Sequence, residues 1–175
     1  KVNCGIASVR AGNVIGGGDW AKQRLIPDII KSVKEGKKLK IRNLNYVRPW
    51  QFVLDPLNGY LILAEQLFLH PKIYSAAWNF GPTIKNSKSV GWIVSKLQNS
   101  LKKELVITNE NKKNKFIETE YLYLNSKKAR KLLNWKPKYN LSESIKRVSD
   151  WYNVFLSKGS LEKITNKQIQ DFLKK

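Results

Sequence analysis

Two residues of the sequence, Tyr123 and Lys127, have the spacing of a proton-transfer pair. A tyrosine and a lysine four residues apart act together when they share one face of a helix, because the ammonium group then lowers the pKa of the phenol. Tyr123 lies in a stretch typical of extended chain, and Ser126 is expected to begin a helix between the two. The pattern therefore favours a packed tyrosine beside a solvated lysine.

Other residues that carry covalent chemistry are scarce. His70 is the only histidine and precedes Pro71 at the expected end of a helix, so we expect no Ser-His-Asp triad. Cys4, the only cysteine, lies in a predicted strand, where a small core residue is more common than a nucleophile. One cysteine and one histidine also exclude a structural zinc site. We therefore assign this chain neither a catalytic residue nor a metal.

Polar residues gather instead in three segments that we expect to be loops at strand ends, residues 13–19, 48–51 and 79–82. In open α/β folds such loops border the ligand crevice. An arginine, two asparagine amides and the backbone of glycines 16–18 suit an anionic, hydroxyl-rich ligand such as a sugar nucleotide, since arginine can fork onto phosphates. The alternative is a surface arginine among turn-forming residues.

The elements that must position these segments alternate along the chain. Hydrophobic periodicity and turn residues predict strands at 6–10, 39–42, 47–54, 76–80 and 105–108, and helices at 27–36, 55–70, 89–101, 126–133, 142–159 and from 165 onward. Asp55 is expected to cap the helix at 55–70, and Ser89 the helix at 89–101. Ser142 and Thr165 are expected to cap the last two helices. This alternation predicts an α/β fold.

The chain of 175 residues has a net charge of +20, from 33 Lys and Arg against 13 Asp and Glu. A nucleic-acid partner must be considered, but only six of the 33 are Arg, and no aromatic RNP motif, zinc finger or basic heptad is present. We expect a solvated, lysine-rich surface without specific nucleic-acid binding, and a basic nucleic-acid-binding module remains the alternative from a different class. No apolar run approaches the ~18 residues of a membrane span, so we expect a soluble protein without a membrane partner.

The start of the sequence is unusual for a complete protein. It contains no methionine, and its first residues already read as a strand. We expect this chain to be part of a longer protein with an N-terminal half before it.

Several segments have a distinctive wording: Val9-Arg-Ala-Gly-Asn-Val-Ile-Gly-Gly-Gly-Asp-Trp20, Arg24-Leu-Ile-Pro-Asp28, Arg48-Pro-Trp-Gln-Phe-Val-Leu-Asp-Pro-Leu-Asn-Gly-Tyr60, Ala77-Trp-Asn-Phe-Gly-Pro82, Ser126-Lys-Lys-Ala-Arg130, Asn134-Trp135 and Trp151-Tyr152. Over essentially the whole chain they resemble the CDP-glucose 4,6-dehydratases, a branch of the extended short-chain dehydrogenases. Sister dTDP-glucose dehydratases and UDP-sugar epimerases share the looser elements, whereas Gly-Gly-Gly-Asp-Trp and Arg-Pro-Trp-Gln point to the CDP-glucose branch.

The resemblance implies a fold and assigns different functions to the two halves of the full-length enzyme. Such enzymes use NAD and carry the glycine-rich fingerprint, the catalytic Tyr-x-x-x-Lys and a Ser or Thr in their first half, none of which is present here. The chain would therefore be the C-terminal part, inactive alone. Residues 1–20 would be a late strand and loop of an incomplete NAD-binding Rossmann domain, and residues 21–175 mostly a mixed α/β sugar-nucleotide-binding domain with elements returning to the Rossmann sheet.

The resemblance also implies a reaction, in which CDP-glucose is oxidised at C4, loses water from C5 and C6, and yields CDP-4-keto-6-deoxyglucose. The enzyme would be cytoplasmic, a homodimer or larger homo-oligomer, and part of deoxysugar synthesis for O-antigen or lipopolysaccharide. The family alternative is another NAD-dependent sugar-nucleotide dehydratase or an epimerase. The implied substrate-binding residues are Asn13, Arg24, Leu25, Arg48 and Asn79, and those near the cofactor are Arg10, Asn13 and Val14.

Overall fold

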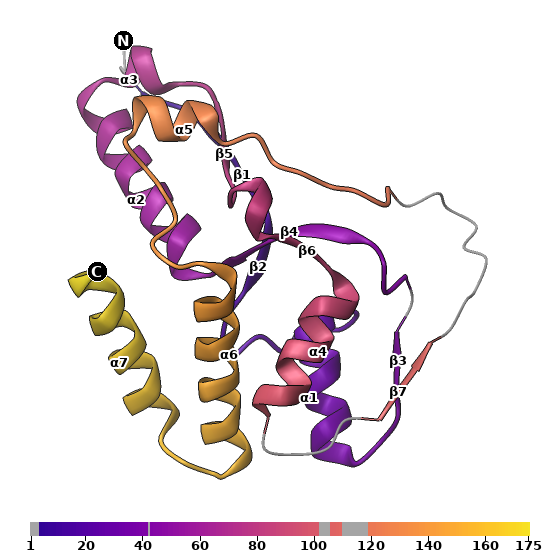
Figure 1. Cartoon of the computed structure of the whole chain (residues 1–175). Coiled ribbons are helices and arrows are strands. Elements are labelled where there is room, and N and C mark those ends of the chain that lie inside the picture. Colours follow the sequence, from indigo (N-terminus) through magenta and orange to yellow (C-terminus); the bar gives the residue numbers. More distant parts are fainter. Residues whose placement is uncertain (1–3, 42, 102–105, 110–118) are drawn as a thin grey trace.

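The computed structural model describes residues 4–41, 43–101, 106–109 and 119–175 (Figure 1). Its elements in chain order are β1 (Ser8–Ala11), β2 (Asn13–Ile15), α1 (Leu25–Glu35), β3 (Leu39–Ile41), β4 (Val47–Phe52), α2 (Leu54–Leu69), α3 (Pro71–Tyr74), β5 (Ala77–Phe80), a 3-10 turn (Ile84–Asn86), β6 (Ser87–Ser89), α4 (Val90–Ser100), β7 (Ile107–Asn109), α5 (Lys127–Leu132), α6 (Leu141–Leu156) and α7 (Leu161–Lys174). The predicted alternation is confirmed. The end of the strand predicted at 39–42 and part of the one predicted at 105–108 lie outside the described residues.

Within the described residues, the strands form three small sheets. β1 pairs with β5, β2 with β4, and β3 with β7, all in parallel, and β6 adds to β4 in the antiparallel sense. The register sets Asn13 opposite Trp50 and Arg10 opposite Asn79. Parallel pairs joined by helical crossovers are typical of an α/β fold, as the sequence predicted.

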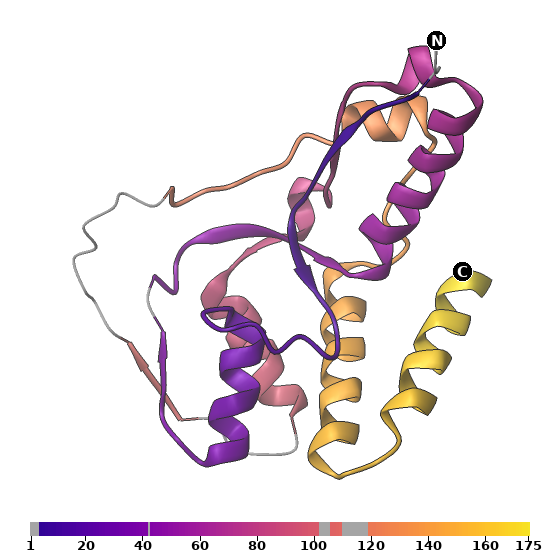
Figure 2. The ribbon, with the colours of Figure 1, turned by 180° about the vertical axis from the view of Figure 1, so that it is seen from behind.

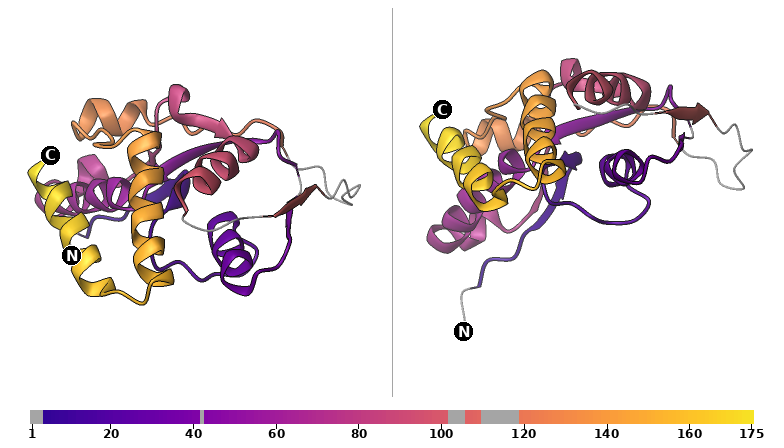
Figure 3. Two further views of the ribbon diagram at one scale, coloured as in Figure 1. Left: turned by 60° about the horizontal axis from the view of Figure 1, so that its bottom comes forward. Right: turned by 90° about the horizontal axis from the view of Figure 1, so that it is seen from below.

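Two hydrophobic cores hold these sheets. The larger core contains buried residues of α1, β2, β4, α4 and α6, such as Ile29, Phe52 and Val148, and Figure 3 shows these helices gathered around the strands. The smaller core lies under α2 and α5 and is built on Trp78, with Phe80 and other buried residues. Among the described residues, no helix combines the length and apolar character that crossing a bilayer requires.

The caps of the last helices differ from the prediction, whereas Ser89 caps α4 as expected, accepting from the Trp92 N–H. α6 is capped by Asn140, whose side chain accepts from the Glu143 N–H while Glu143 accepts from the Asn140 N–H. This reciprocal pair starts the helix before Ser142. α7 begins after Ser160, and Thr165 lies within it. These two predicted caps were wrong because a better capping residue occurs upstream in each case.

Asp55 does not cap α2 either, since the helix begins one residue earlier and Asp55 is only 1% exposed. Its Oδ1 accepts from the Lys138 backbone N–H at 2.7 Å, and its carbonyl oxygen accepts from Trp135 Nε1 at 3.0 Å. These bonds join the start of α2 to the connection between α5 and α6. Within the described chain Oδ2 has no hydrogen-bond partner, and burial raises the pKa of the carboxyl to about 6.

The pH dependence of stability tests this arrangement. A carboxyl whose pKa is higher in the folded state than in the unfolded state binds its proton more tightly when folded, so its contribution to the free energy of unfolding rises as the pH falls. For Asp55 this window runs from about 6 down to its ordinary value of 3.8. Between pH 7 and pH 4 we expect wild type to gain about 2 to 3 kcal/mol relative to Asp55→Asn, measured by urea unfolding. If the free energy of unfolding changes with pH in the same way in both proteins, the pKa of Asp55 is not raised by folding.

Candidate functional site

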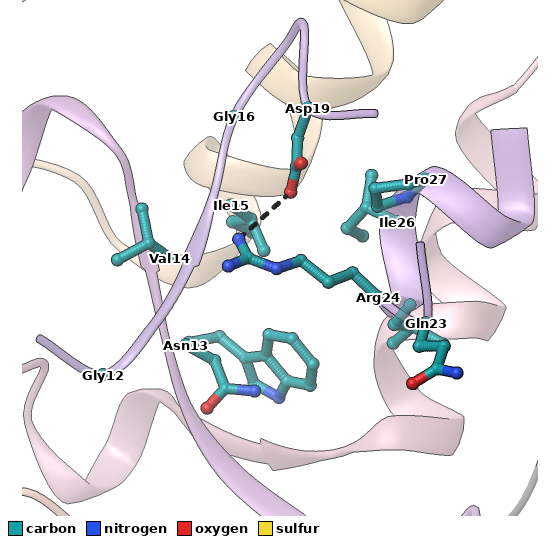
Figure 4. Close-up of a pocket in the computed structure, with 12 residues that line it drawn as sticks. Gly12, Asn13, Val14, Ile15, Gly16, Asp19, Gln23, Arg24, Ile26 and Pro27 are labelled. Atoms are coloured by element: carbon teal, nitrogen blue, oxygen red, sulfur yellow. Dashed lines mark hydrogen bonds and ion pairs between the residues drawn. The ribbon is translucent and has the colours of Figure 1, made fainter. Parts of the chain in front are cut away.

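A cavity of about 380 Å³ opens between β2, the segment that follows it and the start of α1 (Figure 4). Asn13 contributes its side chain from β2, and Trp50 forms part of the wall from β4. Arg24 extends into the space from the N-cap position of α1. This space is the first compartment of the site.

A second cavity of about 370 Å³ adjoins the first. It is lined from β3, β4 and α1, and it includes Arg48 and Tyr46. Four residues line both cavities, namely Asn13, Gln23, Leu25 and Trp50. We therefore describe the two compartments as one groove.

Arg48 is 8% exposed, yet it lines the second compartment. Its Nη1 donates to the carbonyl oxygens of Val47 at 2.9 Å and Glu120 at 3.2 Å, and its guanidinium lies 5.2 Å from the centre of the Tyr46 ring. These contacts fix the plane of the guanidinium. The aromatic ring that the guanidinium contacts is that of Tyr46.

Arg24 is held differently. Its side chain is largely exposed and forms an ion pair with Asp19 at 3.5 Å, drawn in Figure 4. The backbone of Asp19 is anchored from α6, because the Tyr152 hydroxyl donates to the Asp19 carbonyl oxygen at 2.9 Å. Burial raises the pKa of Tyr152 to about 12, so the hydroxyl keeps its proton for this bond. The segment before α1 is thus tied to the larger core.

The remaining predicted site residues lie in different places. Val14 lines the first compartment, whereas Arg10 and Asn79 line neither compartment and sit side by side in the β1–β5 sheet. Asn79 Nδ2 donates to the Asn125 carbonyl oxygen at 3.2 Å. The structure therefore brings Asn13, Val14, Arg24, Leu25 and Arg48 to one groove and places Arg10 and Asn79 on the neighbouring sheet.

Two details of the sequence prediction are wrong. Residues 48–51 belong to strand β4, and residues 13–15 form strand β2, so these polar groups project from strands and not from loops. The consecutive glycines also serve packing. A Cβ at Gly16 would lie 2.7 Å from the Val53 side chain, and one at Gly17 would lie 2.2 Å from the Trp151 ring. The absence of a side chain at these two positions is therefore required by the protein's own packing, and Gly16 also lines the first compartment.

Sequence reasoning missed several residues of the groove, among them Gln23, Asp28 and Tyr46. Gln23 lies between the compartments with a left-handed φ of 62°, which its sequence context does not signal. Tyr46 precedes β4, and Asp28 lies in the first turn of α1. A signal for Asp28 was available, because residues four apart on a helix share a face and Arg24 had been assigned to the site.

Tyr123 and Lys127 lie at the entry to α5, and the prediction of a packed tyrosine is wrong. Tyr123 is exposed in irregular chain, and Lys127 begins α5. The two side chains therefore do not share a helix face.

Comparison with solved structures defines the class of fold. The chain superposes on UDP-glucuronic acid 4-epimerase from Bacillus cereus with a TM-score of 0.70 at 20% identity, over 86% of this chain and 46% of that one. It superposes on dTDP-glucose 4,6-dehydratase from Bacillus anthracis with a TM-score of 0.63 at 22% identity, over 83% and 44% of the two chains. The fold is that of the extended short-chain dehydrogenases.

Sequence comparison defines the family within that class. Residues 13–148 match the GDP-mannose 4,6 dehydratase family, and the chain belongs to it. It is 39% identical over 171 residues to the CDP-glucose 4,6-dehydratase of Salmonella typhimurium, a match that covers 97% of this chain and 47% of that protein. The chain thus spans about half the length of this curated relative.

The packing role of the glycines gives a stability test. Gly17→Ala should lower the free energy of unfolding by about 2 to 3 kcal/mol, because the new methyl group displaces the Trp151 ring. Gly36→Ala is the control. A Cβ at Gly36 would meet no atom within 4 Å. Because Gly36 has a left-handed backbone conformation, the substitution should lower the free energy of unfolding by about 1 kcal/mol. If urea unfolding shows Gly17→Ala to be as stable as wild type, Trp151 does not occupy this position.

Proposed function

We propose that this chain supplies the nucleotide-sugar-binding part of an NAD-dependent CDP-glucose 4,6-dehydratase. The observation that carries the proposal is the groove that unites Asn13, Arg24 and Arg48 in a chain so similar to a CDP-glucose 4,6-dehydratase. The reaction oxidises C4 of the glucosyl unit, removes water from C5 and C6, and leaves a 4-keto-6-deoxy sugar.

The residues of the groove have separate tasks. Arg48 binds the diphosphate, since a guanidinium held in a fixed plane presents paired N–H donors to phosphate oxygens. Asn13 lies on the sugar side, where its carboxamide can both donate to and accept from hydroxyl groups. Arg24 and Leu25 are further contacts at the start of α1, and we assign Asn79 a supporting role from the neighbouring sheet.

The residues present fit one side of an NAD site. Arg10 lies near the carboxyl end of the parallel strand β1, where ligands bind in such sheets, and Asn13 and Val14 follow it at the start of β2. At Gly16 and Gly17 the space that a side chain would take is occupied by Val53 and Trp151. The bound cofactor would supply the redox chemistry at the sugar, and this chain would position the sugar for it.

The exposed surfaces support the proposed division into residues 1–20 and residues 21–175. Parallel sheets are normally buried on both faces, yet β1 is largely exposed and, in Figure 2, lies uncovered in front of the other elements. α2 exposes Leu57, Leu61 and Phe68 along one side. We infer that β1 and β5 are strands of a Rossmann sheet and that α2 packs beside it. The other elements of that domain would cover the exposed surfaces of β1 and α2.

The proposal also includes the location, the oligomeric state and the pathway of the enzyme. We place the enzyme in the cytoplasm, as a homodimer or larger homo-oligomer, in deoxysugar synthesis for O-antigen or lipopolysaccharide. The similarity to CDP-glucose 4,6-dehydratase supports this setting, whereas an epimerase or a dehydratase for another nucleotide would use the same fold. Identification of the sugar product separates these activities.

The diphosphate contact is tested by substitution of Arg48. Arg48→Ala should weaken CDP-glucose binding by about 2 to 4 kcal/mol, roughly 30- to 1000-fold, and Arg48→Lys should recover only part of this because an ammonium group cannot form a bidentate fork. Titration calorimetry measures the affinities, and circular dichroism checks that each variant is folded.

Lys146→Ala is the matched control, since it removes one positive charge from an exposed site on α6. Equal affinities for the Arg48→Ala variant and this control would place the diphosphate elsewhere.

A further inference from the structure

The second compartment contains a carboxylate that diphosphate binding does not explain. Asp28 lines it together with Arg48 and Lys40. A negative charge beside a phosphate site weakens phosphate binding by like-charge repulsion, whereas the two cations strengthen it. Asp28 therefore calls for a ligand group of another kind.

The backbone and its neighbours hold this carboxylate in place. Asp28 lies one helical turn after Arg24 in the first turn of α1, where the helix dipole favours a negative charge. The positive charge of Lys31 and a hydrogen bond from the Gln23 backbone N–H both act to lower its pKa. Partial burial nevertheless raises its pKa, so the carboxylate is incompletely solvated. A half-buried acceptor on a helix is a rigid recognition element.

The walls around Asp28 suit a flat, partly apolar ring. β3 contributes Leu39 and Ile41, both buried in the larger core, while Tyr46 and Val90 contribute from the neighbouring elements. If Arg48 binds the diphosphate and Asn13 the sugar side, the rest of the second compartment is left for the nucleoside. The base then lies within the compartment that contains Asp28.

Resting on the proposed function, we propose that Asp28 selects the nucleobase by accepting a hydrogen bond from the exocyclic amino group of cytosine. An ionised carboxylate only accepts hydrogen bonds, and the 4-amino group of cytosine is a donor. Uracil and thymine carry a carbonyl oxygen at the same position, which would face the carboxylate as a second acceptor. Asp28 is thus a specificity-determining residue that favours cytidine nucleotides over uridine and thymidine nucleotides.

The test compares CDP with UDP, whose bases differ at position 4, an amino group against a carbonyl oxygen, and at N3, which carries a hydrogen only in uracil. Wild type should bind CDP at least about tenfold more tightly than UDP in titration calorimetry. Asp28→Asn should reduce this ratio to within about threefold, because a carboxamide can turn either a donor or an acceptor towards the base. Asp150→Asn is the matched control on the exposed surface of α6 and should keep the wild-type ratio.

The outcomes separate this inference from the proposed function. If wild type binds both nucleotides with equal affinity, or if Asp28→Asn keeps the wild-type preference while folded, the base is selected elsewhere and the nucleotide-binding groove still stands. If wild type binds neither CDP nor UDP, the proposed function itself fails, and the inference fails with it. Asp28→Ser, whose hydroxyl also donates and accepts, gives the same comparison should the Asn variant prove unfolded.

Discussion

Strand β4 is the element on which the arrangement of the groove depends. It pairs with β2 on one edge and β6 on the other, and most of its residues are buried. Side chains extend this pairing: Gln51 Nε2 donates to the Phe80 carbonyl oxygen at 2.8 Å, and Trp50 Nε1 donates to the Lys88 carbonyl oxygen at 2.9 Å. The strand thereby links the larger core to the β1–β5 sheet. A slip of one residue would turn its buried side chains to the opposite face.

The register of β4 decides which groups meet in the groove. Because Trp50 lies opposite Asn13, the positions of these two residues in the groove are set by backbone hydrogen bonds. Arg48, two residues before Trp50 on the same strand, is held by the Val47 and Glu120 carbonyl oxygens. Binding residues fixed in this way lose little conformational entropy when a ligand arrives.

Local features could be predicted from the sequence, and tertiary ones could not. Ser89 caps α4 because a hydroxyl and the first turn of a helix need no other partner. Asp55 has the same local signal, but its carboxylate bonds instead to the backbone at Lys138, which the chain brings near only after folding. For the same reason, Gly17 suggested a ligand contact when its neighbour is Trp151. Arg48 and Asn13 line one groove, as expected from their segments, whereas Asp28 was not assigned to the site although it ends the Arg24–Asp28 segment.

The most direct test of the account is to map the binding of CDP-glucose on this chain by nuclear magnetic resonance. Titration of ¹⁵N-labelled protein should shift the amide signals of Asn13, Gln23 and Leu25 and the indole signal of Trp50, since these residues line both compartments. The signals of α7 should remain unchanged. Shifts confined to other surfaces, or no shifts at saturating CDP-glucose, would contradict the conclusion that this groove binds the nucleotide sugar.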